Sequence, residues 1–140
     1  MKKLISILSL LFLIIVTVNA QDDLPKDSKI EKNKIKTIVE NKYDYETGKE
    51  VKKLIKIARY NEKAQLIEYK EFDDKSKLVK WEKYEYNSDG DKSKETQYDI
   101  SGKVTKINEY NYSNRLLKEK ISYNPDGKIK SKKIVGYEYY

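Results

Sequence analysis

Residues 84–104 read YEYNSDGDKSKETQYDISGKV and carry one short phrase twice. Each copy begins with an aromatic residue and Asn or Asp, passes through turn-forming residues to a glycine, and then enters a strand-like run. Glycine, Asn and Asp are typical of tight turns, because they adopt backbone dihedral angles that most residues avoid. The stretch therefore predicts successive β-hairpins, and variants of it recur from about Tyr43 to the end of the sequence.

The copies align in one register. They are YNEKAQL at 60–66, FDDKSKL at 72–78, YNSDGDK at 86–92, YDISGKV at 98–104, the contracted YSNRL at 112–116, and YNPDGKI at 123–129. The leading residues Tyr60, Tyr86 and Tyr112 lie 26 positions apart. A fixed period of this length is the mark of a repeat protein. The repeating unit is a pair of strands, one shorter and one longer.

A helix competes with a strand only in the stretch VKKLIKIARY, residues 51–60. Val51, Leu54, Ile55 and Ala58 have the spacing of an amphipathic helix, but the same run also alternates with period two. The equivalent positions in later copies are rich in Tyr, Trp, Val and Ile, which favour strands. The repeat register therefore predicts a strand here.

Seven turns separate about eight strands over residues 35–140. We expect an all-β domain, an antiparallel β-meander of tandem hairpin repeats that forms one curled and twisted sheet. Lys and Glu alternate with Tyr and Ile throughout, so neither face is expected to be cleanly apolar. We expect the aromatic rings to form cross-strand ladders, and Trp81 to pack opposite Tyr69 or Ile107.

The first 20 residues have the features of a signal peptide. Lys2 and Lys3 precede an apolar run, and Val18-Asn19-Ala20 fits the small-residue rule for cleavage. The alternative is an uncleaved anchor, but the run of 15 residues is short for a membrane-spanning helix. We expect residues 21–34 to be a flexible leader. The absence of cysteine suits export to a bacterial periplasm or exterior.

The charge pattern disfavours nucleic acid as a partner. Without the signal peptide the chain carries 28 basic and 23 acidic residues, a net charge of +5. Most lysines alternate with Glu or Asp, and a small net charge spread over a sheet gives only a weak field. After cleavage we expect no membrane span.

Catalytic and metal-binding patterns are sparse. The chain has no histidine and no cysteine, which excludes the commonest nucleophile pairs, general bases and zinc sites. Adjacent carboxylates at Asp73 and Asp74 belong to a turn. The loop at 85–90 resembles the start of a calcium loop, but Thr96 stands where the bidentate Glu is required. A cation loosely held by Asp89 and Asp91 is the alternative to a plain turn. We expect no catalytic residue, cofactor or metal.

The phrases at 98–104 and 123–129, each followed by a Lys-rich strand, resemble the YD repeats of the Rhs (rearrangement hotspot) family. The resemblance covers residues 43–140, although Ala64 and Ser76 replace the glycine in two copies. In that family the repeats form curled β-sheet shells around a toxin or a binding region. This chain has only about seven units, so the resemblance implies the sheet geometry but not a closed shell.

The sequence favours an exported, non-catalytic module that binds a protein or a glycan through a face or an edge of its sheet. The alternative is a structural, envelope-associated protein without a discrete ligand, and an enzyme that uses carboxylates comes third. The candidate contact residues are aromatic: Trp81, Tyr84, Tyr86, Tyr110, Tyr112, Tyr137 and Tyr139. Neither the partner nor the oligomeric state follows from the sequence.

Overall fold

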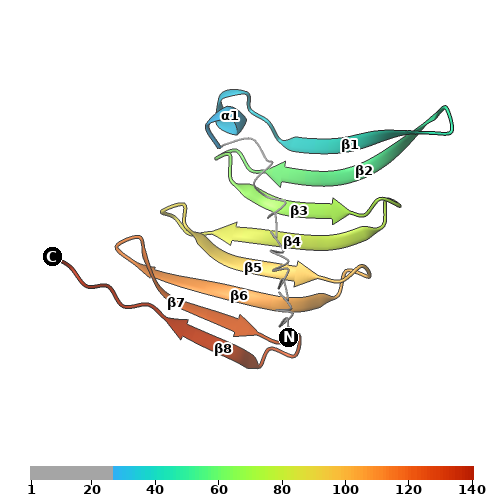
Figure 1. Ribbon diagram of the computed structural model, residues 1–140. Coiled ribbons are helices and arrows are strands. Elements are labelled where there is room, and N and C mark those ends of the chain that lie inside the picture. Colours follow the sequence, from blue (N-terminus) through green and yellow to red (C-terminus); the bar gives the residue numbers. More distant parts are fainter. Residues whose placement is uncertain (1–26) are drawn as a thin grey trace, which may run out of the picture.

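The computed structural model describes residues 27–140, so the expected signal peptide and residues 21–26 of the expected leader lie outside the described part. One short helix precedes eight strands (Figure 1). Their bounds are α1 Asp27–Lys32, β1 Thr37–Glu46, β2 Lys49–Tyr60, β3 Leu66–Phe72, β4 Leu78–Tyr86, β5 Lys92–Tyr98, β6 Val104–Ser113, β7 Leu116–Tyr123 and β8 Ile129–Ile134.

The strands form one antiparallel sheet in the order of the sequence, from β1 to β8. This confirms the predicted meander, including the strand over 51–60 where a helix was the alternative. The sheet is not closed into a barrel, so β1 and β8 are free edges at opposite ends of it (Figure 1).

Five hairpins share one turn of five residues, at 61–65, 73–77, 87–91, 99–103 and 124–128. In each turn the first residue donates its N–H to the carbonyl of the fifth, and the fourth donates to the carbonyl of the first. The fourth residue always has a positive φ, between 58° and 86°: Ala64, Ser76, Gly90, Gly102 and Gly127. The aligned phrases therefore mark real equivalents, even where glycine is absent.

The remaining two hairpins close with two residues of positive φ, Thr47–Gly48 and Asn114–Arg115. Positive φ at both positions identifies the tight turn that matches the twist of the flanking strands. The contracted copy at 112–116 is thus a shorter turn in the same register.

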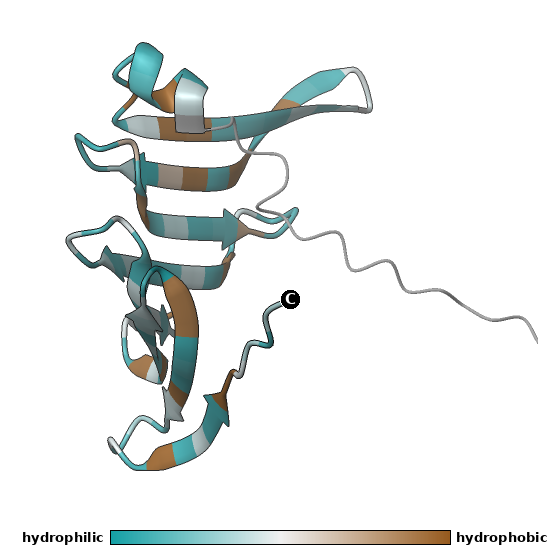
Figure 2. Ribbon diagram, turned by 90° about the vertical axis from the view of Figure 1, so that its left-hand side faces the viewer, coloured by the Kyte–Doolittle hydropathy of each residue, from teal (hydrophilic) through white to brown (hydrophobic). Residues whose placement is uncertain are grey.

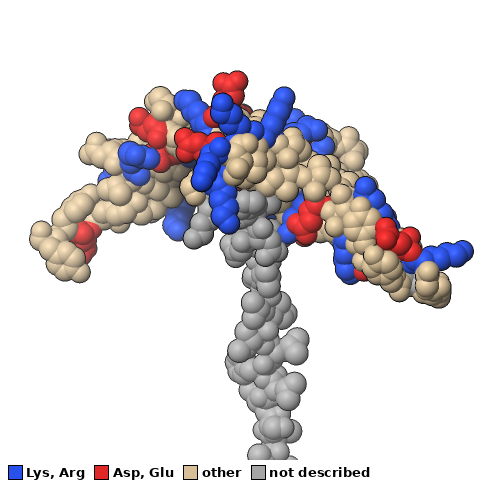
Figure 3. All heavy atoms as spheres, turned by 90° about the horizontal axis from the view of Figure 1, so that it is seen from above, with Lys and Arg blue, Asp and Glu red and all other residues tan. Residues whose placement is uncertain are grey.

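Every hairpin also contains one register shift between its two strands. In five of them the unpaired residue is the second of the strand that follows the turn: Ile67, Val79, Ser93, Thr105 and Lys130. A β-bulge bends its strand and increases the local twist. The described chain is accordingly arched, with both flanks bending to the same side (Figure 3).

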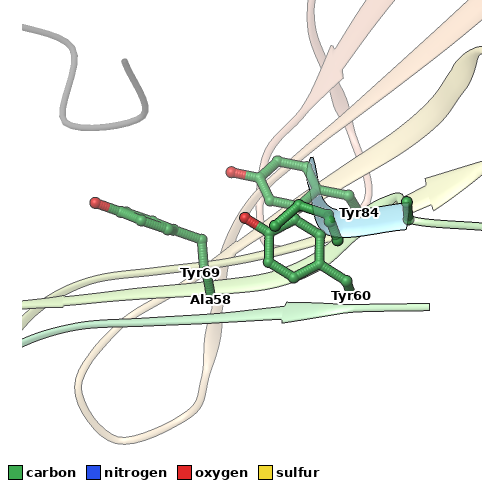
Figure 4. Packing of buried hydrophobic residues seen from close by; sticks show 6 residues of the cluster. Ala58, Tyr60, Tyr69 and Tyr84 are labelled. Carbon is green, nitrogen blue, oxygen red and sulfur yellow. The ribbon is translucent and has the colours of Figure 1, made fainter. Parts of the chain in front are cut away.

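The apolar core is small and lies at the N-terminal end of the sheet (Figure 4). Ile30 of α1 is 1% exposed and packs with a cluster from β2, β3, β4 and the first five-residue turn: Ala58, Tyr60, Ala64, Tyr69 and Tyr84. The expected leader is therefore partly helical, because one apolar side chain anchors a short helix on this cluster. Elsewhere apolar and polar residues alternate along the strands (Figure 2).

Residue pairing across the strands separates two faces. We call one the tyrosine face, with Tyr69, Glu82, Tyr84, Glu95 and Tyr110, and the other the tryptophan face, with Glu68, Lys70, Trp81, Lys83 and Tyr98. Trp81 pairs with Lys70, whereas Tyr69 pairs with Glu82. The expectation that Trp81 packs opposite Tyr69 is therefore wrong.

The expected ring ladders are also wrong. On the tyrosine face each ring lies across from a charged side chain, Tyr69 from Glu82, Tyr84 from Glu95, and Tyr110 from Lys120. The rings alternate with charges across the strands as well as along them. The face is consequently held by hydrogen bonds rather than by stacked rings.

Candidate functional site

Two carboxylates form the centre of the tyrosine face. Gln97 donates from Nε2 to Glu82 Oε1 and to Glu95 Oε1, at 3.2 Å in each case. Tyr84 donates its hydroxyl to Glu82 Oε2, and Lys80 lies 3.3 Å from the same carboxylate. Both oxygens of Glu82 are thus engaged by neighbouring side chains.

Glu95 is held even more completely. Lys92 Nζ lies 2.9 Å from Oε2, and Asn108 and Tyr110 donate to its two oxygens at 3.1 and 3.2 Å. Asn108 accepts in turn from Ser122 Oγ at 2.7 Å, which extends the network to β7. Burial acts to raise the pKa of Glu95, but the bond to Lys92 and its charge, with the bonds from Tyr110 and Asn108, lower that pKa overall.

The tyrosines of this network shift in the opposite direction. Burial first, and then the neighbouring carboxylates, raise the pKa of Tyr84, Tyr110 and Tyr69 well above the ordinary value of 10.0. General acid–base catalysis needs a group whose pKa lies near the working pH. The shifts move Glu95 and these tyrosines away from neutrality, which suits a structural network of permanent charges and neutral phenols.

Trp81 on the tryptophan face is surrounded by its neighbours. Its ring stacks on Tyr98 with centroids 4.8 Å apart and planes 29° apart, and Lys70 Nζ lies 4.2 Å from the ring centroid. Trp81 Nε1 donates to Glu68 Oε1 at 2.9 Å, and Glu68 also pairs with Arg59 at 2.7 Å. A sugar-stacking platform needs a free ring face, and this ring is already engaged by an aromatic neighbour and a cation.

Three of the candidate tyrosines fasten the hairpins together. Tyr86 donates its hydroxyl to Leu66 O at 2.8 Å, Tyr112 to Lys92 O at 3.0 Å, and Tyr137 to Leu117 O at 2.9 Å. Each bond reaches back 20 residues, from the end of an even-numbered strand to the start of the strand after the preceding turn. We call these residues the tyrosine latches. The 26-residue spacing marked them, but not their role.

The seven candidate aromatics do not gather into one surface. Trp81 lies on the tryptophan face, Tyr84 and Tyr110 lie within the network of the tyrosine face, and the latches lie at strand ends. Tyr139 is 78% exposed and, like Tyr137, follows the end of β8 rather than belonging to a strand. The predicted aromatic contact surface is therefore not assembled in the described structure.

A groove of about 770 Å³ lies between α1 and the first five-residue turn. Its apolar lining includes Ile30, Ile35 and Ile67, and its charged lining mixes Glu31 and Glu62 with Lys34 and Lys36. Charges of both signs give it no preference for an anion or a cation.

The loop at 87–91 behaves as a turn. Asn87 Oδ1 accepts from the N–H of Asp91 at 2.8 Å, and Asp91 Oδ1 lies 3.6 Å from Arg115 Nη2, while Asp89 is exposed. Within residues 27–140 no group of three potential metal ligands comes together. In the same range no helix has the length and apolarity needed to cross a membrane.

The edges of the sheet offer what the faces do not. All residues of β8 are exposed, and β7 is its only neighbour in the sheet. At the other end β1 pairs with β2 alone. Beyond Lys56, β2 has no partner in β3, so the β1–β2 hairpin projects past its neighbours (Figure 1). The candidate functional site is therefore the pair of free edges.

No protein-family model matches the chain, and no curated protein is similar to it.

Proposed function

We propose that the chain is an exported, non-catalytic repeat module that binds a protein partner by adding a strand to an edge of its sheet. Main-chain hydrogen bonds supply the affinity in this mode of recognition, and side chains that alternate along the strand supply the specificity. The single observation that supports it most is the contrast between the fully exposed edge strand β8 and the engaged side chains of both faces.

A partner on either face would first have to displace internal contacts. Glu82 and Glu95 are already bound by the side chains around them, and Trp81 is stacked. Breaking such charge-assisted hydrogen bonds is costly unless the ligand replaces each of them. This favours the edges over the faces, and a protein over a glycan.

Export to the periplasm or the cell exterior, and the relationship to YD repeats of the Rhs family, belong to the same proposal. They rest on the first 20 residues and on the turn phrases. The second candidate remains a structural, envelope-associated protein without a discrete ligand. It is favoured by the mixing of positive and negative side chains over the surface (Figure 3).

Affinity capture from the envelope fraction of the source organism tests the proposal. The bait is the protein as its cell processes it, compared with a double variant of the β8 edge, Lys130→Glu with Lys133→Glu. The matched control carries the same charge change in two exposed turns, Lys63→Glu with Lys75→Glu. We expect a partner that the edge variant loses and the turn variant keeps. A partner retained equally by all three baits would place binding elsewhere, and no partner above background would favour the structural role.

A further inference from the structure

We propose that the two edges are complementary, and that β8 of one copy of the chain pairs with β1 of another, head to tail. The inference rests on the proposed strand-addition function and names its partner as a second copy. Three independent observations carry it: the phase of the repeat, the charge of the two edge strands, and their exposed apolar side chains.

The phase of the repeat leaves each edge with a missing neighbour. Inside the sheet every even-numbered strand is followed by an odd-numbered one. β8 is equivalent to β4 and β6, because the latch Tyr137 follows it as Tyr86 and Tyr112 end those strands. The next strand in the series would be odd-numbered, and the free odd-numbered strand is β1. Pairing β8 with β1 of another copy continues the antiparallel meander without a change of pattern.

The charges of the two edges are opposite. β8 contains Lys130, Lys132 and Lys133 and no acidic residue, which gives a charge of +3. β1 contains Glu40, Asp44 and Glu46 against Lys42, which gives −2. Opposite charges across a strand pair are favourable and like charges are not. The sheet uses this pairing internally, for example between Lys94 and Glu85 at 3.5 Å.

The same charges select the geometry of assembly. Lysine on an edge strand normally protects that strand from pairing, and here it would repel a second β8. An acidic β1 would likewise repel a second β1. Only the unlike pair is attractive, so the contact is heterologous and leaves a free edge of each kind on the assembly, which can therefore grow.

Apolar side chains on the tryptophan face add to the match. Val39 of β1 is 54% exposed, and Ile129 and Ile134 of β8 are 60% and 73% exposed. Strand pairing assigns all three to the tryptophan face. A strand added at either edge would bring these side chains beside those of its neighbour and remove part of their surface from water.

Sedimentation velocity of the purified protein over a range of concentrations tests the inference. We expect association that weakens as salt is raised from about 0.05 to about 0.5 M, because exposed charges are screened. The Lys130→Glu, Lys133→Glu variant should lower the association constant by roughly tenfold or more, since its edge then repels β1. The Lys63→Glu, Lys75→Glu variant should associate like the unmodified protein. A monomer at every concentration and salt would overturn the inference.

Cross-linking separates the possible contacts, and the chain has no native cysteine to interfere. Val39→Cys and Ile134→Cys chains of different tagged mass are mixed and treated with a short bismaleimide. We expect the mixed product to dominate. Products that join Val39→Cys to itself or Ile134→Cys to itself would overturn the head-to-tail contact. If self-association fails while affinity capture still finds an edge-dependent partner, the inference falls and the proposed function stands.

Discussion

At the scale of single residues, the fold depends on a backbone conformation that most side chains avoid. Gly90, Gly102 and Gly127 hold φ between 81° and 86° at the fourth position of their turns. Non-glycine residues pay about 1–2 kcal/mol in this left-handed region. Ala64 and Ser76 pay it in two copies, so the turn geometry is imposed by the hairpins rather than by glycine alone.

Gly127→Ala isolates this cost. A Cβ built on Gly127 meets nothing within 4 Å, so the substitution changes the backbone preference and no contact. We expect it to lower the free energy of unfolding by about 1 kcal/mol, measured by urea denaturation. An unchanged unfolding midpoint would mean that this turn is not formed.

Arg115→Gly should act in the opposite direction. It converts the turn Asn114–Arg115 into Asn-Gly, the pair that this two-residue turn prefers, at a position with φ of 64°. The ion pair with Asp91 is lost, but at 3.6 Å with an exposed Arg115 side chain it contributes little. We expect a gain of roughly 0.5–1 kcal/mol in the same denaturation experiment. A loss of stability would show that the pair to Asp91 matters more than the turn.

At the scale of elements, the tyrosine latches couple each hairpin to the next. Tyr86→Phe removes a hydroxyl that bonds to Leu66 O in a half-buried position, and should cost about 1 kcal/mol or slightly more. Tyr45→Phe is the matched control, because Tyr45 bonds to Glu50 at an exposed site and should change stability by less than about 0.5 kcal/mol. Equal effects of the two substitutions in urea denaturation would contradict the coupling.

The elements also show where the sequence is informative. The phrases from Tyr60 to Tyr123 predicted each turn, because the backbone requirement at the fourth position leaves a residue signature. The helix α1 left none, since six residues with one buried side chain, Ile30, have no periodicity. Which residues lie across from Trp81 depends on strand registration and on the bulges, which have no sequence signature here, so its surroundings were not predicted.

At the scale of the whole molecule, the network of the tyrosine face predicts a stability plateau. The pKa of Glu95 is lowered in the fold, so its contribution is complete above its ordinary value of 4.5 and is lost as the pH falls through the folded value. The pKa values of Tyr84 and Tyr110 are raised, so their contribution is complete below 10.0 and is lost as the pH rises further.

Urea midpoints measured between acid and alkaline pH should therefore be flat in the middle and fall on both sides. Glu95→Gln should make the acid fall shallower, because it removes one of the groups that must be protonated. Tyrosine absorbance should show that the phenols of the network ionise only as the chain unfolds. Ionisation at ordinary pH in the folded protein would contradict the network.

The whole molecule is an open strip whose faces are satisfied internally and whose edges are not. Its candidate site could not be read from the sequence, because each tyrosine that suggested a ligand surface is used for internal bonds. The acidic β1 and the basic β8 became a pair only when the sheet placed them at opposite edges.

Hydrogen–deuterium exchange in dilute and concentrated protein tests this account most directly. We expect exchange at residues 37–46 and 129–134 to slow as the concentration rises, because the outward amides of β1 and β8 gain partners. Exchange in the central strands should stay the same. Equal exchange at both concentrations along both edges, or slowing confined to β3–β6, would contradict the claim that the molecule works through its edges.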